Sequence, residues 1–371
     1  MEQMNKKTGL VSRRKFIGTT AVAATALSVL PLSSRCGRMQ QAKAPETGAN
    51  LPNSRFAGVQ IGTITYSWRD LPGKAEDILK YCKESGVSSI ELMGDAVESY
   101  AGLPPSPTEL PDPLPPAAKA RLDGMLKEYK VTLEQFRKMV EPNVWPMVVA
   151  GVVGTTEEQV KWRTSVPMTK FEELRKMYND AGVEIHIVKL SPAGWSDAEI
   201  DYAFNVAKAL GAKGTTDESS LETAKRLAPF AQKHGLYAIL HNHFQFADPK
   251  YNVDEILAVS PSIMLNFDCG HYFGSTGLNP VDFINKYHNR IISLHLKDKT
   301  GPKTTPPNEN QVWGQGEVPL ADILLLLKQH AAEEGWPKYG DIELEYPVPK
   351  WSNSVKEVKT CVAYAKEILV C

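Results

Sequence analysis

Imidazole and carboxylate side chains gather near the ends of four consecutive hydrophobic segments in the C-terminal half of the chain. They are His241 and His243, then Asp268 and His271, then His295, and finally Glu343 and Glu345. In the first and last segments the two residues stand two positions apart, which places both on one face of an extended strand. Burying so many of these groups without a partner would be costly, and a bound divalent cation removes that cost. The ligand types, which include no thiolate, suit Mn, Co, Zn, Mg or Fe.

Each of these signals also has a structural interpretation when it is taken alone. A single His at a strand end commonly makes hydrogen bonds within the core, and Glu343 with Glu345 also suits an exposed edge. A metal-free protein is therefore an open alternative at this point.

Alternating strand and helix patterns supply the elements that position these residues. Amphipathic stretches end at glycines that lead directly into the next β-rich run, as at Gly86 and Gly235. Neighbouring parallel strands need such a helical crossover. Eight units of this kind predict an α/β fold, the closed (β/α)8 TIM barrel. The eight predicted strands cover residues 59–65, 87–92, 183–190, 212–216, 236–243, 263–267, 291–297 and 341–346.

One region interrupts this alternation between the second and third predicted strands. Residues 96–170, approximately, contain a proline-rich stretch at 103–116 and helical patterns around 117–138 and 157–178, without a convincing strand. We expect a helical insertion that caps the barrel mouth or mediates association into a homo-oligomer. A separate small domain is the alternative.

Composition narrows the classes of partner. The formal net charge is -1, and no run of Lys or Arg occurs beyond the extreme N-terminus, so a nucleic-acid partner is not expected. The five cysteines form no CxxC pair, which gives no support to a thiolate zinc site or a redox motif.

The N-terminus has the features of an export signal. The segment Ser12-Arg13-Arg14-Lys15-Phe16-Ile17 precedes a short apolar run, and its paired arginines resemble the signal of the twin-arginine export machinery. We therefore expect a signal segment at 1–36, a tether at 37–55, a barrel at 56–371 and an exported, periplasmic location. Cys36 is a candidate lipid-attachment site, but Arg35 precedes it where lipoproteins usually have a small residue.

Several motifs together resemble the xylose isomerase-like TIM barrel superfamily, which includes sugar phosphate isomerases and epimerases and the inosose dehydratase branch. The motifs are Asp268-x-x-His271, His295-Leu296-Lys297-Asp298, Gly314-Gln315-Gly316-Glu317-Val318, and Glu343 on the last strand. The resemblance implies a divalent metal held by His241, Asp268, His295 and Glu343. His241 departs from the epimerase pattern, which commonly has a Glu there that serves as one of two acid/base groups.

A metal in this position would assist removal of a proton next to a carbonyl of a sugar. The candidate catalytic residues for this step are Glu343, Glu345, His243 and His271. The candidate substrate-binding residues are Lys189, Lys297, Trp313 and Glu91.

Three functions follow from this interpretation. The first is a metal-dependent isomerase or epimerase acting on a small-molecule sugar or keto-sugar. The second is a lyase or dehydratase of the same fold, which the His241 departure and the expected export favour. The third is a carbohydrate-binding lipoprotein without catalytic turnover.

Overall fold

The computed structural model describes residues 51–140 and 145–371 of the chain. The predicted signal segment and most of the predicted tether lie outside these residues. Within the described part, no helix combines the length and apolar character needed to cross a membrane.

Eight parallel strands close into a barrel, which confirms the predicted fold. Each strand pairs with the next along the chain, and the last pairs with the first, so the sheet has no free edge among these eight. The strands are β2 (Val59–Ile64), β3 (Ser89–Met93), β4 (Glu184–Lys189), β5 (Gly214–Glu218), β6 (Tyr237–His241), β7 (Ile263–Asp268), β8 (Ile291–Leu296) and β11 (Tyr339–Ile342). A short strand β1 (Arg55–Phe56) adds an antiparallel pairing to β2.

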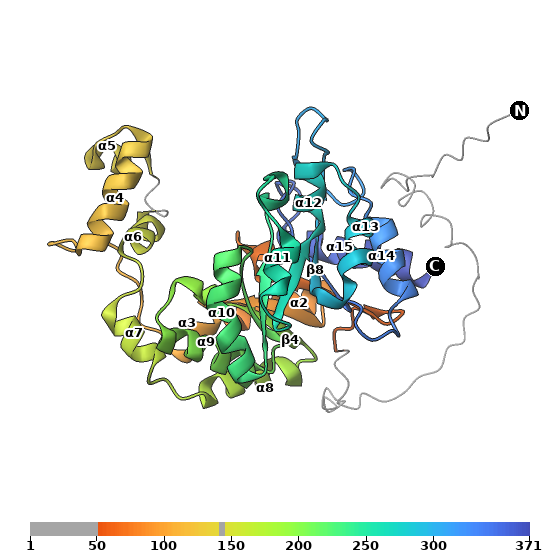
Figure 1. Cartoon of the computed structure of the whole chain (residues 1–371), viewed down its shortest axis with the longest axis horizontal. Coiled ribbons are helices and arrows are strands. Elements are labelled where there is room, and N and C mark those ends of the chain that lie inside the picture. Colours follow the sequence, from red (N-terminus) through yellow and green to blue (C-terminus); the bar gives the residue numbers. More distant parts are fainter. Residues whose placement is uncertain (1–50, 141–144) are drawn as a thin grey trace, which may run out of the picture.

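The helices cover the outside of the barrel and bury one face against the strands (Figure 1). Three of them end at the glycines that the sequence indicates: Gly86, Gly211 and Gly235 all have positive φ and donate to carbonyls of the last helical turn. The helices flanking the strands are α2 (Ala75–Ser85), α3 (Gly94–Ala101), α8 (Thr169–Asp180), α9 (Asp197–Leu210), α10 (Leu221–His234), α11 (Val253–Ala258), α12 (Cys269–Thr276), α13 (Pro280–Tyr287), α14 (Leu320–Gln329) and α15 (Ser354–Val370).

Shorter elements lie in the connections. One-turn 3-10 helices are η1 (Thr65–Trp68), η2 (Pro192–Gly194), η3 (Gln245–Ala247) and η4 (His288–Arg290). The connection after β8 forms a small antiparallel pair of its own, β9 (Asp298–Lys299) with β10 (Asn310–Gln311). This pair begins directly beyond the C-terminal end of β8, where a TIM barrel has its active site.

The described residues of the insertion between β3 and β4 form four helices, α4 (Pro116–Tyr129), α5 (Leu133–Met139), α6 (Trp145–Val153) and α7 (Glu157–Arg163). In Figure 1, α4, α5 and α6 stand away from the barrel helices as a separate group. Two small hydrophobic clusters, around Leu122 and around Phe136, hold this group together. The insertion is fastened to the barrel through α7, where Arg163 forms buried ion pairs with Glu98 at 2.7 Å and Glu199 at 3.1 Å.

A candidate metal centre at the mouth of the barrel

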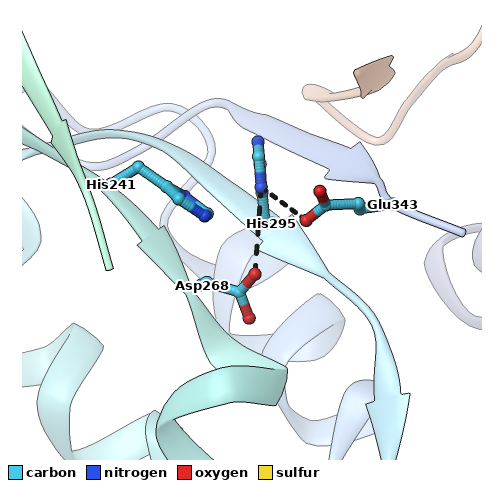
Figure 2. A group of neighbouring side chains, drawn as sticks. All are labelled: His241, Asp268, His295 and Glu343. Atoms are coloured by element: carbon cyan, nitrogen blue, oxygen red, sulfur yellow. Dashed lines mark hydrogen bonds and ion pairs between the residues drawn. The ribbon is translucent and has the colours of Figure 1, made fainter. Parts of the chain in front are cut away.

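Four side chains converge at the C-terminal ends of neighbouring strands. His241 is the last residue of β6, Asp268 the last of β7, His295 lies one residue before the end of β8, and Glu343 directly follows β11. The pairing register sets Asp268 beside His295 and ends β11 level with β8. Figure 2 shows the four side chains pointing toward one another. The sequence-based prediction that these residues share one end of the barrel is therefore met by the arrangement of the strands.

The distances suit a single ion. One ligand atom from each of the four residues lies within 4.8 Å of the others. Ligands on opposite sides of an ion with bonds of about 2.0–2.2 Å stand about 4.0–4.4 Å apart, so closing by a few tenths of an ångström completes the sphere. His241 Nδ1 is buried and has no hydrogen-bond partner among the described residues, and Asp268 Oδ2 is buried with only the ion pair to Lys297 Nζ, at 2.9 Å. An unpartnered imidazole nitrogen beside carboxylate oxygens fits a metal-binding group of residues.

Local structure fixes the orientation of Asp268. This residue is the N-cap of α12, and its Oδ1 accepts a hydrogen bond from the backbone N–H of His271 at 2.7 Å. The side chain of Asn242 holds the backbone of Asp268: its Oδ1 accepts from Asp268 N at 2.9 Å, and its Nδ2 donates to the Asp268 carbonyl at 3.2 Å. Because Oδ1 is committed to the helix, Oδ2 faces the cluster.

His295 lies between two carboxylates. Its Nδ1 is 2.8 Å from Glu343 Oε2 and its Nε2 is 2.7 Å from Glu91 Oε2. Burial alone lowers the pKa of His295, but Glu343 and Glu91 outweigh burial and hold that pKa well above its ordinary value. Burial likewise raises the pKa of Glu343, yet Lys297 and then His295 bring it well below the usual range. The metal-free cluster therefore carries an imidazolium beside ionised carboxylates.

Glu91 lies behind His295 rather than in the open mouth. It is fully buried, and it also accepts hydrogen bonds from Thr216 Oγ1 at 3.0 Å and Asn266 Nδ2 at 2.7 Å. Burial raises the pKa of Glu91, but His295 reverses this effect, so its pKa is below the ordinary value. A carboxylate on the far nitrogen of a metal-binding His fixes the tautomer and orientation of the ring. The structure thus places Glu91, a predicted substrate-binding residue, where it orients the ring of His295.

A second group of ligand types, Glu91, His295 and Asp341, lies deeper in the barrel. Asp341 Oδ2 already accepts from Ser293 Oγ at 2.5 Å and contacts His186 Nε2 at 2.9 Å. Hydrogen bonds within the protein occupy most of the carboxylate oxygens of Glu91 and Asp341. The group of His241, Asp268, His295 and Glu343 is therefore the better candidate for a metal site.

Lys297 lies among the carboxylates of the cluster and not in a position open to solvent. Only 2% of the residue is exposed, and its Nζ is 2.9 Å from Asp268 Oδ2, 2.7 Å from Glu343 Oε2 and 3.1 Å from Glu345 Oε2. It also donates to His271 Nε2 at 2.9 Å. Burial and then Lys297 lower the pKa of His271 to about 2, so this imidazole is neutral. Lys297 therefore neutralises the same carboxylates that would hold the metal.

The rim of the site is formed by His243 and its neighbours. The His243 side chain is 42% exposed, and its ring centroid is 4.9 Å from that of His271. Glu218, at the end of β5, lies 2.8 Å from His243 Nδ1 and 3.7 Å from Lys189 Nζ. The hydrogen bond to Glu218 raises the pKa of His243 above its ordinary value. His243 and Lys189 therefore share one carboxylate partner at the mouth.

Comparison with known proteins decides the family. The sequence model of the xylose isomerase-like TIM barrel family matches residues 79–360, more than half of the chain. The chain belongs to this family.

Relatives within and around the family include isomerases and dehydratases. An inosose dehydratase from Clostridium beijerinckii is 34% identical over 79 residues, a match that spans 20% of this chain and a quarter of that relative. A sugar phosphate isomerase/epimerase from Parabacteroides distasonis has a TM-score of 0.50 at 17% identity, over 88% of this chain and all of the other. A xylose isomerase domain protein from Alicyclobacillus acidocaldarius has a TM-score of 0.52 at 10% identity, over 83% of this chain and 98% of the other. At these identities the structures show a shared fold.

Of the residues predicted for the site of this xylose isomerase-like barrel, Trp313 is the one that the structure places elsewhere. Its indole is buried and packs edge-on against Tyr364 of α15, with ring centroids 5.7 Å apart. A tryptophan in a loop beyond a strand end can fill the outer core as readily as it lines the mouth, and sequence alone does not distinguish the two.

Two residues of the mouth were not identified from the sequence. Glu218 ends the fourth barrel strand, two residues beyond the predicted strand at 212–216. Lys299 lies two residues beyond Lys297, in the β9–β10 pair, which no sequence pattern indicates. The first had a usable signal in the run Asp217-Glu218, whereas the second had none.

Proposed function

We propose that this protein is a divalent-metal-dependent isomerase or epimerase that acts on a sugar or keto-sugar by removing a proton next to a carbonyl. The observation that carries the proposal is the convergence of His241, Asp268, His295 and Glu343 at the mouth of a xylose isomerase-like barrel. When bound there, a divalent ion would polarise a carbonyl and an adjacent hydroxyl of the substrate.

Glu345 and His243 are the acid/base groups of this proposal. Glu345 is outside the four-ligand group, its side chain is 17% exposed, and Lys297 holds its Oε2 at 3.1 Å. His243 bonds Glu218 through Nδ1, which leaves Nε2 to exchange a proton with a bound substrate. Both residues border His271, at 3.7 Å from Glu345 Oε2 to Nε2 and at 4.9 Å between the two imidazole centroids. The dyad of His243 and Glu218 would supply the acid/base group that His241 does not.

The proposal is tested first on the metal. Elemental analysis of purified protein should give about one equivalent of divalent metal per chain, and Asp268→Ala should lose it. Asp254→Ala, which alters an exposed carboxylate on α11, is the matched control and should keep the metal. Stoichiometric metal in Asp268→Ala would contradict the assignment.

The reaction is tested by hydrogen exchange. Metal-loaded protein incubated with candidate keto-sugars in D₂O should incorporate deuterium next to the carbonyl and form an isomer or epimer. Glu345→Gln should abolish incorporation while the metal content stays unchanged. Absence of exchange with every keto-sugar would favour a binding protein over an enzyme.

A lyase or dehydratase of the same fold is the second candidate. It is favoured by His241, which stands where the epimerases commonly have a carboxylate, and by the short match to an inosose dehydratase. In this reaction the same proton removal is followed by loss of a β-substituent from the substrate. Release of water or of an aglycone in the D₂O experiment would select this candidate, and exchange without such a product would exclude it.

We also propose that the protein is exported to the periplasm by the twin-arginine machinery. The sequence Arg13-Arg14 before the apolar run supports this location. Cell fractionation should recover the wild-type protein in the periplasm or at the membrane, and replacement of both arginines by lysine should retain it in the cytoplasm. An unchanged distribution would refute this route, and mass spectrometry of the mature N-terminus would show whether Cys36 carries lipid.

A further inference from the structure

Lys299 is a buried cation at the barrel mouth that has no anionic partner. It is the second residue of β9 and only 2% of it is exposed. Within residues 51–140 and 145–371, no carboxylate oxygen lies within the 4.0 Å of an ion pair from its Nζ. Lys297, two residues earlier, has three such carboxylates. The two lysines therefore differ in their ion pairing, although they lie two residues apart beyond the end of β8.

The ammonium group of Lys299 lies near His271, the residue that both proposed acid/base groups border. Its Nζ is 5.7 Å from the ring centroid of Phe244, and that ring is 5.0 Å from the ring of His271. Phe244 is half exposed at the rim. The contact with an aromatic face offsets part of the cost of removing the ammonium from water, but it supplies no counter-charge. Burial, followed by repulsion from Lys297, lowers the pKa of Lys299 below its ordinary value.

A glycine of α12 allows the side chains of Lys299 and Asn308 to pack closely against the helix. Gly274 of α12 faces them: a Cβ at this position would lie 3.1 Å from Lys299 Cε and 2.2 Å from Asn308 Oδ1. Any larger residue at 274 would therefore displace both side chains. Asn308 Oδ1 is itself buried and has no hydrogen-bond partner among the described residues. The side chain of the unpaired lysine and an unsatisfied acceptor oxygen thus lie against the same glycine.

We infer that Lys299 binds a carboxylate of the substrate and that Asn308 Oδ1 accepts a hydrogen bond from a hydroxyl of the same molecule, so that the sugar handled by this barrel is a sugar acid. This inference rests on the proposed function and names its substrate class. A single ammonium matches the single charge of a carboxylate, and an amide oxygen accepts from a hydroxyl such as sugars carry. A phosphate dianion would meet one cation and the nearby carboxylates of Asp268 and Glu345, because Lys297 is already committed to them.

The test compares two ligands that differ in one group. Gluconate and glucitol carry the same chain of hydroxyls, but only gluconate has a carboxylate. Calorimetric titration of the full-length, metal-loaded protein should show gluconate binding about tenfold or more tightly than glucitol, as expected for one charged hydrogen bond. Lys299→Met should remove this preference. Lys303→Met, which alters an exposed lysine of the same connection, should retain it.

Two further variants separate binding from folding. Lys299→Arg keeps the positive charge and should keep a preference for gluconate, and Asn308→Ala should weaken gluconate binding while a preference over glucitol remains. Equal binding of the two ligands by the wild type would overturn the inference. A preference that survives in Lys299→Met would also overturn it, because the carboxylate would then bind elsewhere, for instance to the metal. The titration needs no turnover, so its result is independent of whether the exchange experiment detects a reaction.

Discussion

Replacing Glu91 by Gln should weaken metal binding without removing a metal ligand. The carboxylate accepts from His295 Nε2 at 2.7 Å, and Asn266 and Thr216 hold it in place. Gln has the same shape, so its oxygen can still accept from His295 while its amide group faces Thr216. What is lost is the negative charge behind the imidazole, and charged hydrogen bonds are about twice as strong as neutral ones.

The expected effect is a 10- to 100-fold increase in the dissociation constant of the metal, which corresponds to about 1.4–2.7 kcal/mol. Competition with a chromophoric chelator measures this constant directly. Glu98→Gln is the matched control, because Glu98 is also a buried carboxylate, and its partner is Arg163 of the insertion. That variant should lose stability and keep the wild-type metal affinity. A dissociation constant unchanged within about twofold in Glu91→Gln would refute the positioning role.

Three further predictions concern the charges of the site and its surroundings. Lys297→Met should destabilise the metal-free protein by about 3–5 kcal/mol, because it removes the cation that pairs with buried carboxylates, and added metal should restore more stability than in the wild type. Urea unfolding with and without metal measures both effects. Equal destabilisation of the metal-loaded and metal-free forms would count against this role of Lys297. Because the pKa of His271 is lower in the folded protein than in the unfolded chain, the unfolded chain is protonated at this residue first as the pH falls. The stability linked to neutral His271 is therefore present above pH about 6.5 and is lost below it. Between pH 7 and pH 5 the wild type should therefore lose about 2 kcal/mol more than His271→Gln, and parallel losses would show that His271 is not the group responsible. Arg163→Met should lower the free energy of unfolding by about 3–5 kcal/mol, because it leaves buried carboxylates on α3 and α9 without their cation. The metal stoichiometry should stay at the wild-type value. Loss of metal in this variant would show that the insertion is linked to the site.

The barrel and the metal-binding group could be predicted because both depend on local patterns. Each strand is a short β-rich run, and β3, β5 and β6 follow the helix-ending glycines Gly86, Gly211 and Gly235, so the alternation is visible in the chain itself. His241, Asp268 and His295 fall at strand ends, and parallel strands bring their C-terminal ends to one rim. Element type was therefore predictable, and the boundaries differ by a few residues: the last strand ends at Ile342, before the predicted 346.

The contacts inside the site could not be predicted from such patterns. Glu91 and His295 are separated by 204 positions, and only closure of the barrel brings them to 2.7 Å. The sequence predicts that Lys297 binds substrate, because a lysine near a strand end can pair with substrate oxygens, whereas in the structure its long side chain turns into the carboxylates. The packing of Trp313 against α15 likewise depends on the path of a long connection. Tertiary closure and side-chain rotamers decide all three cases.

Diffraction from crystals of the metal-loaded protein at the absorption edge of the bound metal tests the central claim most directly. We expect one anomalous peak per chain, about 2.0–2.3 Å from one atom each of His241, Asp268, His295 and Glu343, with His295 Nε2 still bonded to Glu91. A peak elsewhere in the chain, or none at full metal occupancy in solution, would contradict the account.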